Sequence, residues 1–204
     1  MSSADSADSS AETNKFPADQ SRPQLPLPSV VPIDTAILVP GFMSPAWMMW
    51  PLAHSLTDEV DCVVRWDYPR VFTDIQATIR SLASEIQSRR SHSQHLAIVT
   101  HSFGDWIARS ALQRIEHHPP TRVVSICPVT TRIIVAAFML QLTRWVLPEL
   151  SVMSNQSLAE VPLPSAPSIT HRVIWASGEL LVPRYIPDPH PSLKETTVLG
   201  MHNS

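Results

Sequence analysis

LAIVTHSFGDWIARSAL, residues 96–112, reads as a strand, a sharp bend and a helix in one continuous run. The apolar residues 96–99 are typical of a short strand that is buried on both faces. Beyond Gly104 the apolar side chains recur with helical spacing, at Ile107, Ala108, Ala111, Leu112 and Ile115. Ser102 stands between the two patterns, so we expect it at the bend that joins a buried strand to an amphipathic helix.

The bend itself, Thr100-His101-Ser102-Phe103-Gly104, is close to the pattern G-x-S-x-G. In that motif a strained turn lifts a serine hydroxyl above the sheet, and glycines allow the strand and helix backbones to approach closely. Gly104 supplies the second glycine, whereas Thr100 replaces the first. The spacing predicts a nucleophilic Ser102, and an ordinary turn serine is the alternative interpretation.

The rest of the chain alternates short apolar runs with helical patterns. A Trp- and Met-rich segment occupies residues 44–56, and a loop rich in Pro and Ser follows the last helix. Strands are expected at 35–39, 62–66, 96–99, 123–127, 171–176 and 196–199, and helices at 74–89, 106–116 and 132–146. This alternation predicts an α/β protein: a single domain with a mostly parallel six-stranded sheet and helices on both faces.

Composition narrows the function classes. The 204 residues have a net charge of −3 and no basic cluster interleaved with aromatic side chains, so nucleic-acid binding has no support. Residues 1–33, rich in Ser, Ala, Asp and Pro, are expected to be a disordered tail without a secretory signal, ahead of a domain at 34–204. Cys62 and Cys127 fall in separate strands, so we expect free thiols and a cytoplasmic protein.

The apolar run at 133–140 has two main interpretations. A helix buried against the sheet is the simpler one, and an apolar cap over a lipid-like substrate is the functional one. Eight apolar residues cannot span a bilayer, which needs about 20, so no integral membrane segment is expected. The histidines other than His101 and His202 lack metal-ligand spacing with a carboxylate or cysteine partner, so no metal site is expected. The reaction that the motifs indicate requires no cofactor.

Read together, these motifs resemble the α/β-hydrolase fold, and within it the lipase- and esterase-like branch whose bend reads T-H-S-x-G. The likeness covers nearly all of residues 34–204. It rests on Val39-Pro40-Gly41-Phe42, Trp66-Asp67-Tyr68-Pro69, the bend around Ser102, and the C-terminal pair 178–183 and 199–202. By resemblance, residues 39–42 match the oxyanion loop, and the C-terminal pair matches the segments that carry the acid and the histidine.

Three positions depart from the family's pattern. Asp105 stands where a second glycine is usual, and its charge could oppose a nearby developing oxyanion. Glu179 holds the place of the acid, which is generally Asp in the family. The sequence ends two residues after His202, so we expect either a domain trimmed at both ends that lacks the family's final helix or an incomplete gene product.

The order Ser102, Glu179, His202 is the one expected of this architecture. His202 would remove the serine proton and Glu179 would orient the imidazole, with Asp188 as the reserve acid. The backbone N–H groups of Phe42 and Phe103 would form the oxyanion hole. Three side chains are expected to contact substrate: His101, Trp47 and Trp106.

The favoured function is therefore a serine hydrolase that cleaves carboxylic esters through an acyl-enzyme, on small-molecule substrates with an apolar acyl group. The alternative is a catalytically inactive binding protein of the same fold. A homodimer is compatible with the apolar sheet face that a missing helix would expose.

Overall fold

The computed structural model describes residues 33–72, 74–117, 120–143, 146–179 and 182–200. The expected tail, except for Ile33, and the expected base His202 lie outside these ranges.

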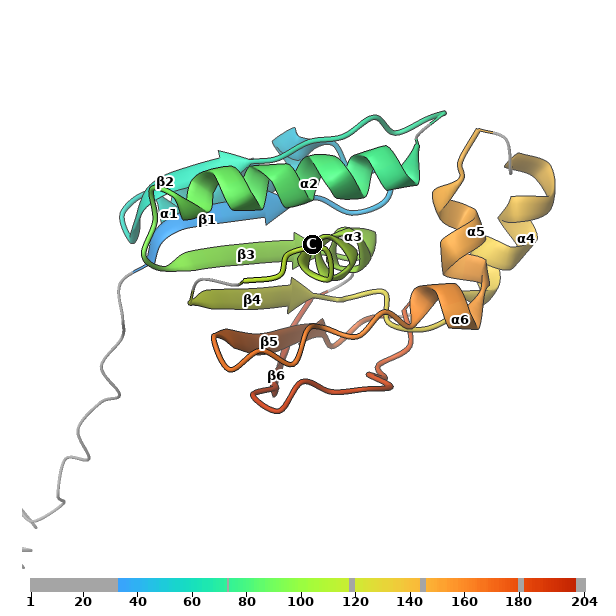
Figure 1. Ribbon diagram of the computed structural model, residues 1–204. Helices are drawn as coiled ribbons and strands as arrows, with labels where there is room; N and C mark the ends of the chain where they lie inside the picture. Colours follow the sequence, from blue (N-terminus) through green and yellow to red (C-terminus); the bar gives the residue numbers. More distant parts are fainter. Residues whose placement is uncertain (1–32, 73, 118–119, 144–145, 180–181, 201–204) are drawn as a thin grey trace, which may run out of the picture. The chain divides into compact units, whose positions relative to one another are not determined.

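A parallel sheet forms the centre of the domain (Figure 1). Within the described ranges it has six strands in the order β2-β1-β3-β4-β5-β6, and every neighbouring pair is parallel. The predicted six-stranded α/β sheet is confirmed, with strand ends that differ by up to two residues. The strands are β1 Ile33–Val39, β2 Val60–Arg65, β3 Leu96–His101, β4 Thr121–Ile126, β5 Ile169–Ala176 and β6 Lys194–Val198.

Helices cover both faces of the sheet. Side chains alternate between the faces along a strand, and neighbours in β1 separate accordingly. Ile37 packs in the main core, which includes residues of α2 (Ile75–Arg90) and α3 (Phe103–Leu112). Leu38 packs with Met49 and Ala53, from the 3-10 turn η1 (Ala46–Met49) and α1 (Trp50–Leu56). The expected active site around Ser102 therefore lies at the carboxyl ends of the strands, between these two layers of helices.

The layer that contains α1 covers only part of its face. In β4 the buried residues alternate with exposed or half-buried ones, and in β5 they do so through Ile174. All five residues of β6 are exposed at the edge of the sheet. The α1 face is thus open over these three strands, whereas the α2–α3 face is closed over β4 and β5.

The segment between β4 and β5 forms three short helices beyond the carboxyl ends of the strands (Figure 1). They are α4 Ile134–Thr143, α5 Glu149–Ser154 and α6 Gln156–Ala159. The interpretation of 133–140 as a helix buried against the sheet is wrong, because Ile134 is 80% and Phe138 71% exposed. Since α4 lies past the last strand residues and packs on α5, no sheet surface is available to cover these side chains. No helix in the described ranges is long and apolar enough to cross a membrane.

Candidate active site

Ser102 occupies a strained bend between β3 and α3. Its φ of 51° and ψ of −123° lie in a region that side chains with a Cβ rarely adopt. Three backbone hydrogen bonds hold it there: its N–H donates to the Ile126 carbonyl at 2.9 Å, and its carbonyl accepts from Asp105 N–H at 3.1 Å and from Val129 N–H at 3.4 Å. A non-glycine residue held this way between a strand and a helix is the backbone feature that G-x-S-x-G motifs require.

Two glycines allow the loop after β1 to approach this bend. A Cβ added to Gly104 would lie 2.4 Å from the Pro40 carbonyl oxygen and 2.6 Å from that of Val39. A Cβ added to Gly41 would lie 3.0 Å from the Cβ of Ser102. Backbone from β1 and the start of α3 therefore meet at distances that side chains would prevent.

The close approach brings the loop that contains Phe42 to the bend, where the Phe103 N–H follows Ser102 directly. Phe103 is the first residue of α3, where N–H groups have no acceptor within the helix. The Phe42 N–H belongs to the same peptide unit as the Gly41 carbonyl, and in a trans peptide these groups point in opposite directions. The Gly41 carbonyl accepts from the Tyr68 hydroxyl at 3.2 Å and from Ser44 N–H at 3.2 Å. These contacts fix the direction of the Phe42 N–H.

Tyr68 is itself held firmly. Burial raises the pKa of its hydroxyl, which therefore stays protonated and able to donate. The Arg70 guanidinium lies 4.2 Å from the centre of the Tyr68 ring and donates to the Ser44 carbonyl at 2.9 Å. Sequence reasoning assigned no role to Tyr68, although the segment Trp66-Asp67-Tyr68-Pro69 was part of the resemblance.

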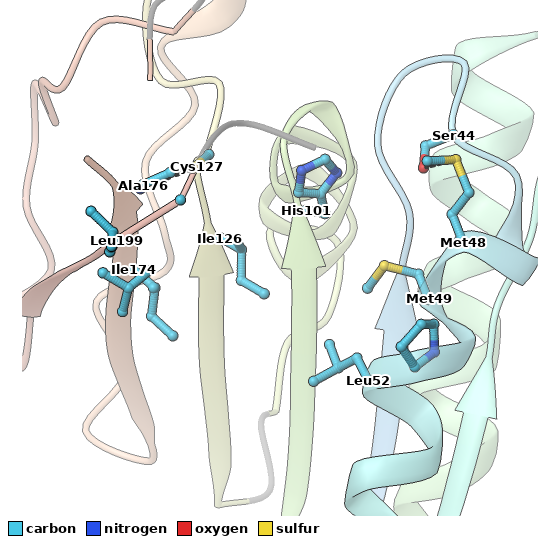
Figure 2. Close-up of a pocket in the computed structure, with 13 residues that line it drawn as sticks. Ser44, Met48, Met49, Leu52, His101, Ile126, Cys127, Ile174, Ala176 and Leu199 are labelled. Atoms are coloured by element: carbon cyan, nitrogen blue, oxygen red, sulfur yellow. Dashed lines mark hydrogen bonds between the residues drawn. The ribbon is translucent and has the colours of Figure 1, made fainter. Parts of the chain in front are cut away.

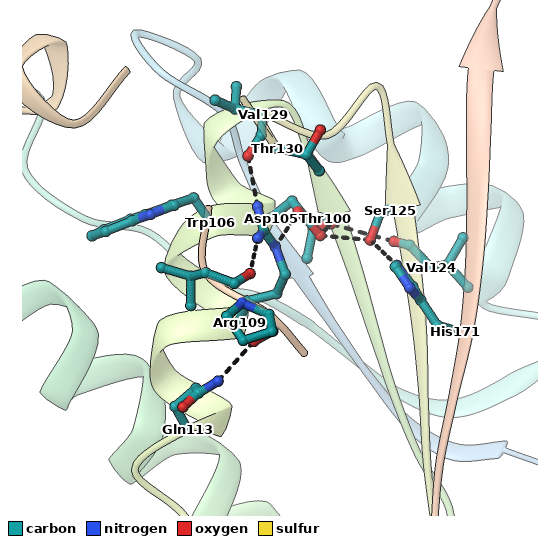
Figure 3. A network of polar contacts seen from close by, with 12 residues as sticks. Thr100, Asp105, Trp106, Arg109, Gln113, Val124, Ser125, Val129, Thr130 and His171 are labelled. Carbon is teal, nitrogen blue, oxygen red and sulfur yellow. Dashed lines mark hydrogen bonds and ion pairs between the residues drawn. The ribbon is translucent and has the colours of Figure 1, made fainter. Parts of the chain in front are cut away.

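Asp105 is buried and its charge is compensated (Figure 3). Its carboxylate pairs with Arg109 Nε at 2.7 Å and accepts from the Ser125 hydroxyl at 2.5 Å and the Thr100 hydroxyl at 3.3 Å. Arg109 in turn donates to the Val129 carbonyl at 2.6 Å. The sequence analysis expected that the Asp105 charge could oppose a developing oxyanion. The ion pair weakens this effect, because a cation one helical turn away neutralises the carboxylate.

The expected acid, Glu179, follows the end of β5. It is half-buried, and its carboxylate accepts from Val182 N–H at 2.9 Å. Cys127, just beyond β4, is its neighbour: burial raises the pKa of that thiol, and the nearby Glu179 carboxylate raises it further. Ser102 is bonded to Ile126, the residue before Cys127. The expected nucleophile and acid thus follow strands that flank β4.

The reserve acid lies elsewhere. Asp188 is exposed and lines a separate cavity with Arg109, His171 and His190. Of the two acids considered, only Glu179 borders the chain segment that contacts Ser102.

A cavity of about 380 Å³ opens beside the bend, on the α1 side of the sheet. Figure 2 shows His101 at the end of β3, with Met48 and Met49 on one side and Cys127 and Leu199 on the other. The volume is within the range of small-molecule sites. The lining is mostly apolar: Ser44, Met48, Met49, Pro51, Leu52, His101, Ile126, Cys127, Ile174, Ala176, Val198, Leu199 and Gly200.

The two tryptophans expected to contact substrate do not line this cavity. Trp47 is 70% exposed on η1. Trp106 is buried on α3, stacks on Phe103 with ring centres 5.3 Å apart, and donates from its indole to the Leu158 carbonyl at 2.7 Å. Of the three residues expected to contact substrate, His101 alone lines this cavity, whereas Trp106 is hydrogen-bonded to α6. No group of three or more His, Cys, Asp or Glu in the described ranges is arranged to hold a metal ion.

Comparison with known proteins supports this description of the fold. No family model and no curated protein matches the sequence. Solved structures do match. Lipase B of Aspergillus fumigatus is 16% identical with a TM-score of 0.61, and the match covers 83% of this chain and 48% of the lipase. The chain therefore spans about half the length of that enzyme.

Two further structures match over most of both chains. One, described as the non-heme bromoperoxidase BpoC of Mycobacterium tuberculosis, is 12% identical with a TM-score of 0.63, covering 83% of this chain and 85% of that one. The other, the type II thioesterase BorB of the borrelidin cluster, is 16% identical with a TM-score of 0.58, covering 90% and 87%. The chain has the α/β-hydrolase fold that its sequence predicted.

Proposed function

We propose that the chain is a serine hydrolase that cleaves carboxylic esters through an acyl-enzyme. The observation that carries the proposal is the strained backbone of Ser102, held between β3 and α3, with Gly41 packed against Ser102 and Gly104 packed against the backbone of Val39 and Pro40. Backbone strain of about 1–3 kcal/mol persists only where surrounding contacts enforce it, and it concentrates at functional sites. The lipase and the thioesterase among the similar structures are consistent with this class of reaction.

In the proposed reaction the Ser102 oxygen attacks the ester carbonyl while His202 removes its proton. The carbonyl oxygen becomes an oxyanion that accepts from the N–H groups of Phe42 and Phe103. His202 then donates the proton to the leaving alcohol, and the bond to that alcohol breaks. Water attacks the acyl-enzyme by the same route, and Glu179 orients the imidazole throughout.

The cavity beside His101 supports an apolar acyl group as substrate. Its side chains from η1, α1 and the strand ends include two methionines and several aliphatic residues, and among the described residues that line it none is a Lys, Arg, Asp or Glu. Burying each CH₂ of an acyl chain contributes about 0.8 kcal/mol. A panel of nitrophenyl esters from acetate to decanoate should therefore show a kcat/KM that rises with chain length until the cavity is filled.

The first test is labelling of the purified full chain by a fluorophosphonate, which requires an activated serine. We expect stoichiometric labelling of the wild type, no labelling of Ser102→Ala, and strongly reduced labelling of His202→Ala. Ser110→Ala, a half-buried serine on the same helix α3, is the matched control and should label like the wild type. A folded wild type that does not label would refute the proposal and favour the inactive binding protein.

The assignment of the acid is tested by a second pair of variants. Glu179→Gln should slow labelling and ester turnover, whereas Asp188→Asn should leave both unchanged because Asp188 lines a different cavity. Equal loss in the two variants would contradict the assignment.

Tyr68 is expected to act as a positioning residue for the oxyanion hole. Tyr68→Phe removes the bond to the Gly41 carbonyl, which is worth about 1 kcal/mol. We expect kcat to fall about fivefold with KM unchanged, because one of the two donors that hold the Gly41 carbonyl is lost and the Phe42 N–H is then aimed less firmly at the developing oxyanion. Tyr185→Phe, at the other tyrosine of the chain, is the control. A rise in KM at constant kcat would contradict this role.

A further inference from the structure

An exposed cluster of large apolar side chains borders the candidate active site. Trp47 on η1 is 70% exposed, Met48 beside it 42%, and Trp50 at the start of α1 56%. Together with Pro51 these side chains line an apolar groove of about 400 Å³. A contiguous cluster of large exposed apolar side chains is typical of a binding surface. The proposed ester hydrolysis, as described so far, does not use it.

The groove is continuous with the cavity beside His101. Met48 and Pro51 line both of them, and both residues are exposed. The Ser44 hydroxyl, which belongs to the cavity, donates to the Met48 sulfur at 3.4 Å, and Figure 2 shows the two side chains together on one side of the cavity. The groove therefore begins at the rim of the cavity, and a ligand longer than the cavity has an apolar path out of it.

Helical spacing arranges the lining of the groove in two rows. Side chains three residues apart lie on the same side of a 3-10 turn and are neighbours on an α-helix. Met48 and Pro51 form the row that faces the cavity, and Trp47 and Trp50 form the next row, which borders only the groove. The Trp50 ring stacks on the His54 ring with centres 5.3 Å apart, which holds the indole in place. The tryptophans thus form the outer part of the apolar path.

The chemistry of the lining favours an alkyl chain. Among the described residues that line the groove, none has a charged side chain. Indole rings supply broad apolar contact area, and the unbranched methionine side chain adapts to the shape of its partner. Each CH₂ group that such contacts fully bury strengthens binding about fourfold, and a half-buried group contributes less. A chain of several CH₂ groups along the groove therefore gains a measurable affinity without any hydrogen bond.

We propose that this groove binds the distal part of a long acyl chain, so that the preferred substrates are esters whose acyl chain is longer than the cavity. The inference rests on the proposed ester hydrolysis and adds a second subsite to it. The ester carbonyl lies at Ser102, the first part of the chain fills the cavity, and the remainder passes Met48 and Pro51 to reach Trp47 and Trp50. Trp47 then contacts substrate through the groove and not through the cavity.

Binding can be measured without turnover in the full chain that carries Ser102→Ala, by calorimetric titration with dodecanoate and with hexanoate. Adding Trp47→Ala should weaken dodecanoate binding about tenfold and hexanoate binding by less than about twofold. Phe138→Ala is the matched control, because this side chain on α4 is 71% exposed, as Trp47 is 70% exposed, and does not line the groove. Equal losses for the two fatty acids, or for Trp47→Ala and Phe138→Ala, would overturn the proposal.

Turnover separates this proposal from the proposed hydrolysis. The ratio of kcat/KM for nitrophenyl dodecanoate to that for nitrophenyl hexanoate should fall about tenfold in Trp47→Ala and stay constant in Phe138→Ala. A wild type that labels with fluorophosphonate, but whose ratio Trp47→Ala leaves unchanged, would refute the groove and leave the hydrolase. A wild type that does not label, but whose dodecanoate binding depends on Trp47, would refute the hydrolase and support the groove.

Two other occupants of the groove give different results. A second copy of the chain predicts that Trp47→Ala lowers the sedimenting mass of the protein, and that result would overturn the proposal. A long alcohol group in place of a long acyl group predicts that Trp47→Ala slows hydrolysis of dodecyl acetate and spares nitrophenyl dodecanoate, which would contradict the acyl assignment.

Discussion

Replacing Gly104 by alanine should disrupt the bend around Ser102. The new Cβ would lie 2.4 Å from the Pro40 carbonyl oxygen, so the loop after β1 or the first turn of α3 must move. Overpacking of this kind costs about 1–3 kcal/mol. Because displacement of reacting groups by about 1 Å can slow a reaction about 100-fold, we expect fluorophosphonate labelling to slow to a similar extent. Thermal unfolding and labelling rates measure the two effects.

The sign of the stability change distinguishes Gly104→Ala from an ordinary glycine-to-alanine change in a helix. Elsewhere in a helix, a glycine-to-alanine change stabilises by up to about 1 kcal/mol. Ser110→Ala, on the same helix, is the matched control and should change stability little. A Gly104→Ala protein that is more stable than the wild type and labels at the same rate would show that the approach of β1 to α3 is not required.

Removing Arg109 should produce the largest loss of stability. Arg109→Leu leaves the Asp105 carboxylate, 1% exposed, without its cation, and an uncompensated buried charge costs about 3–5 kcal/mol. The double variant Asp105→Asn with Arg109→Leu should lose less than Arg109→Leu alone, because no charge then remains to be buried. Urea unfolding of the single and double variants measures the difference.

The chain provides its own comparison for this experiment. Arg89 and Glu85 form an ion pair at 2.8 Å with the same spacing of four residues, but their side chains are 38% and 28% exposed. Arg89→Leu should therefore change the free energy of unfolding by no more than about 1 kcal/mol. Equal losses for Arg89→Leu and Arg109→Leu would contradict the view that burial, and not pairing itself, makes Asp105 depend on Arg109.

Much of the fold could be predicted from the sequence because its signals are local. The apolar run 96–99 and the helical spacing after Gly104 identify a buried strand and its helix, and the other strands follow in the same way. The bend around Ser102 was predictable for the same reason, because a serine followed two residues later by a glycine indicates a tight local bend between a strand and a helix.

Features that depend on contacts distant in the sequence were not predictable. The sequence analysis considered the Asp105 charge alone, and only the packing of α3 against β4 shows that Arg109 pairs with it and that Ser125 and Val129 complete the network. The apolar run at 133–140 gave no sign that it lies beyond the strand ends, because periodicity does not say which surface is available. The role of Tyr68 requires the chain to bring it to Gly41, 27 residues away.

The exposed edge strand β6 has a consequence for how the purified protein behaves as a colloid. An edge strand offers unpaired N–H and C=O groups on which a neighbouring chain can add a strand. Lys194 and Glu195 begin β6 as exposed charged residues, the Glu195 carboxylate accepting from the Trp175 indole at 2.8 Å, and charged residues at an edge disfavour flat addition of another strand. The next three residues, Thr196, Thr197 and Val198, favour β-structure. The two charged residues at the start of β6 are therefore expected to oppose aggregation in which the sheet of one molecule continues into the next.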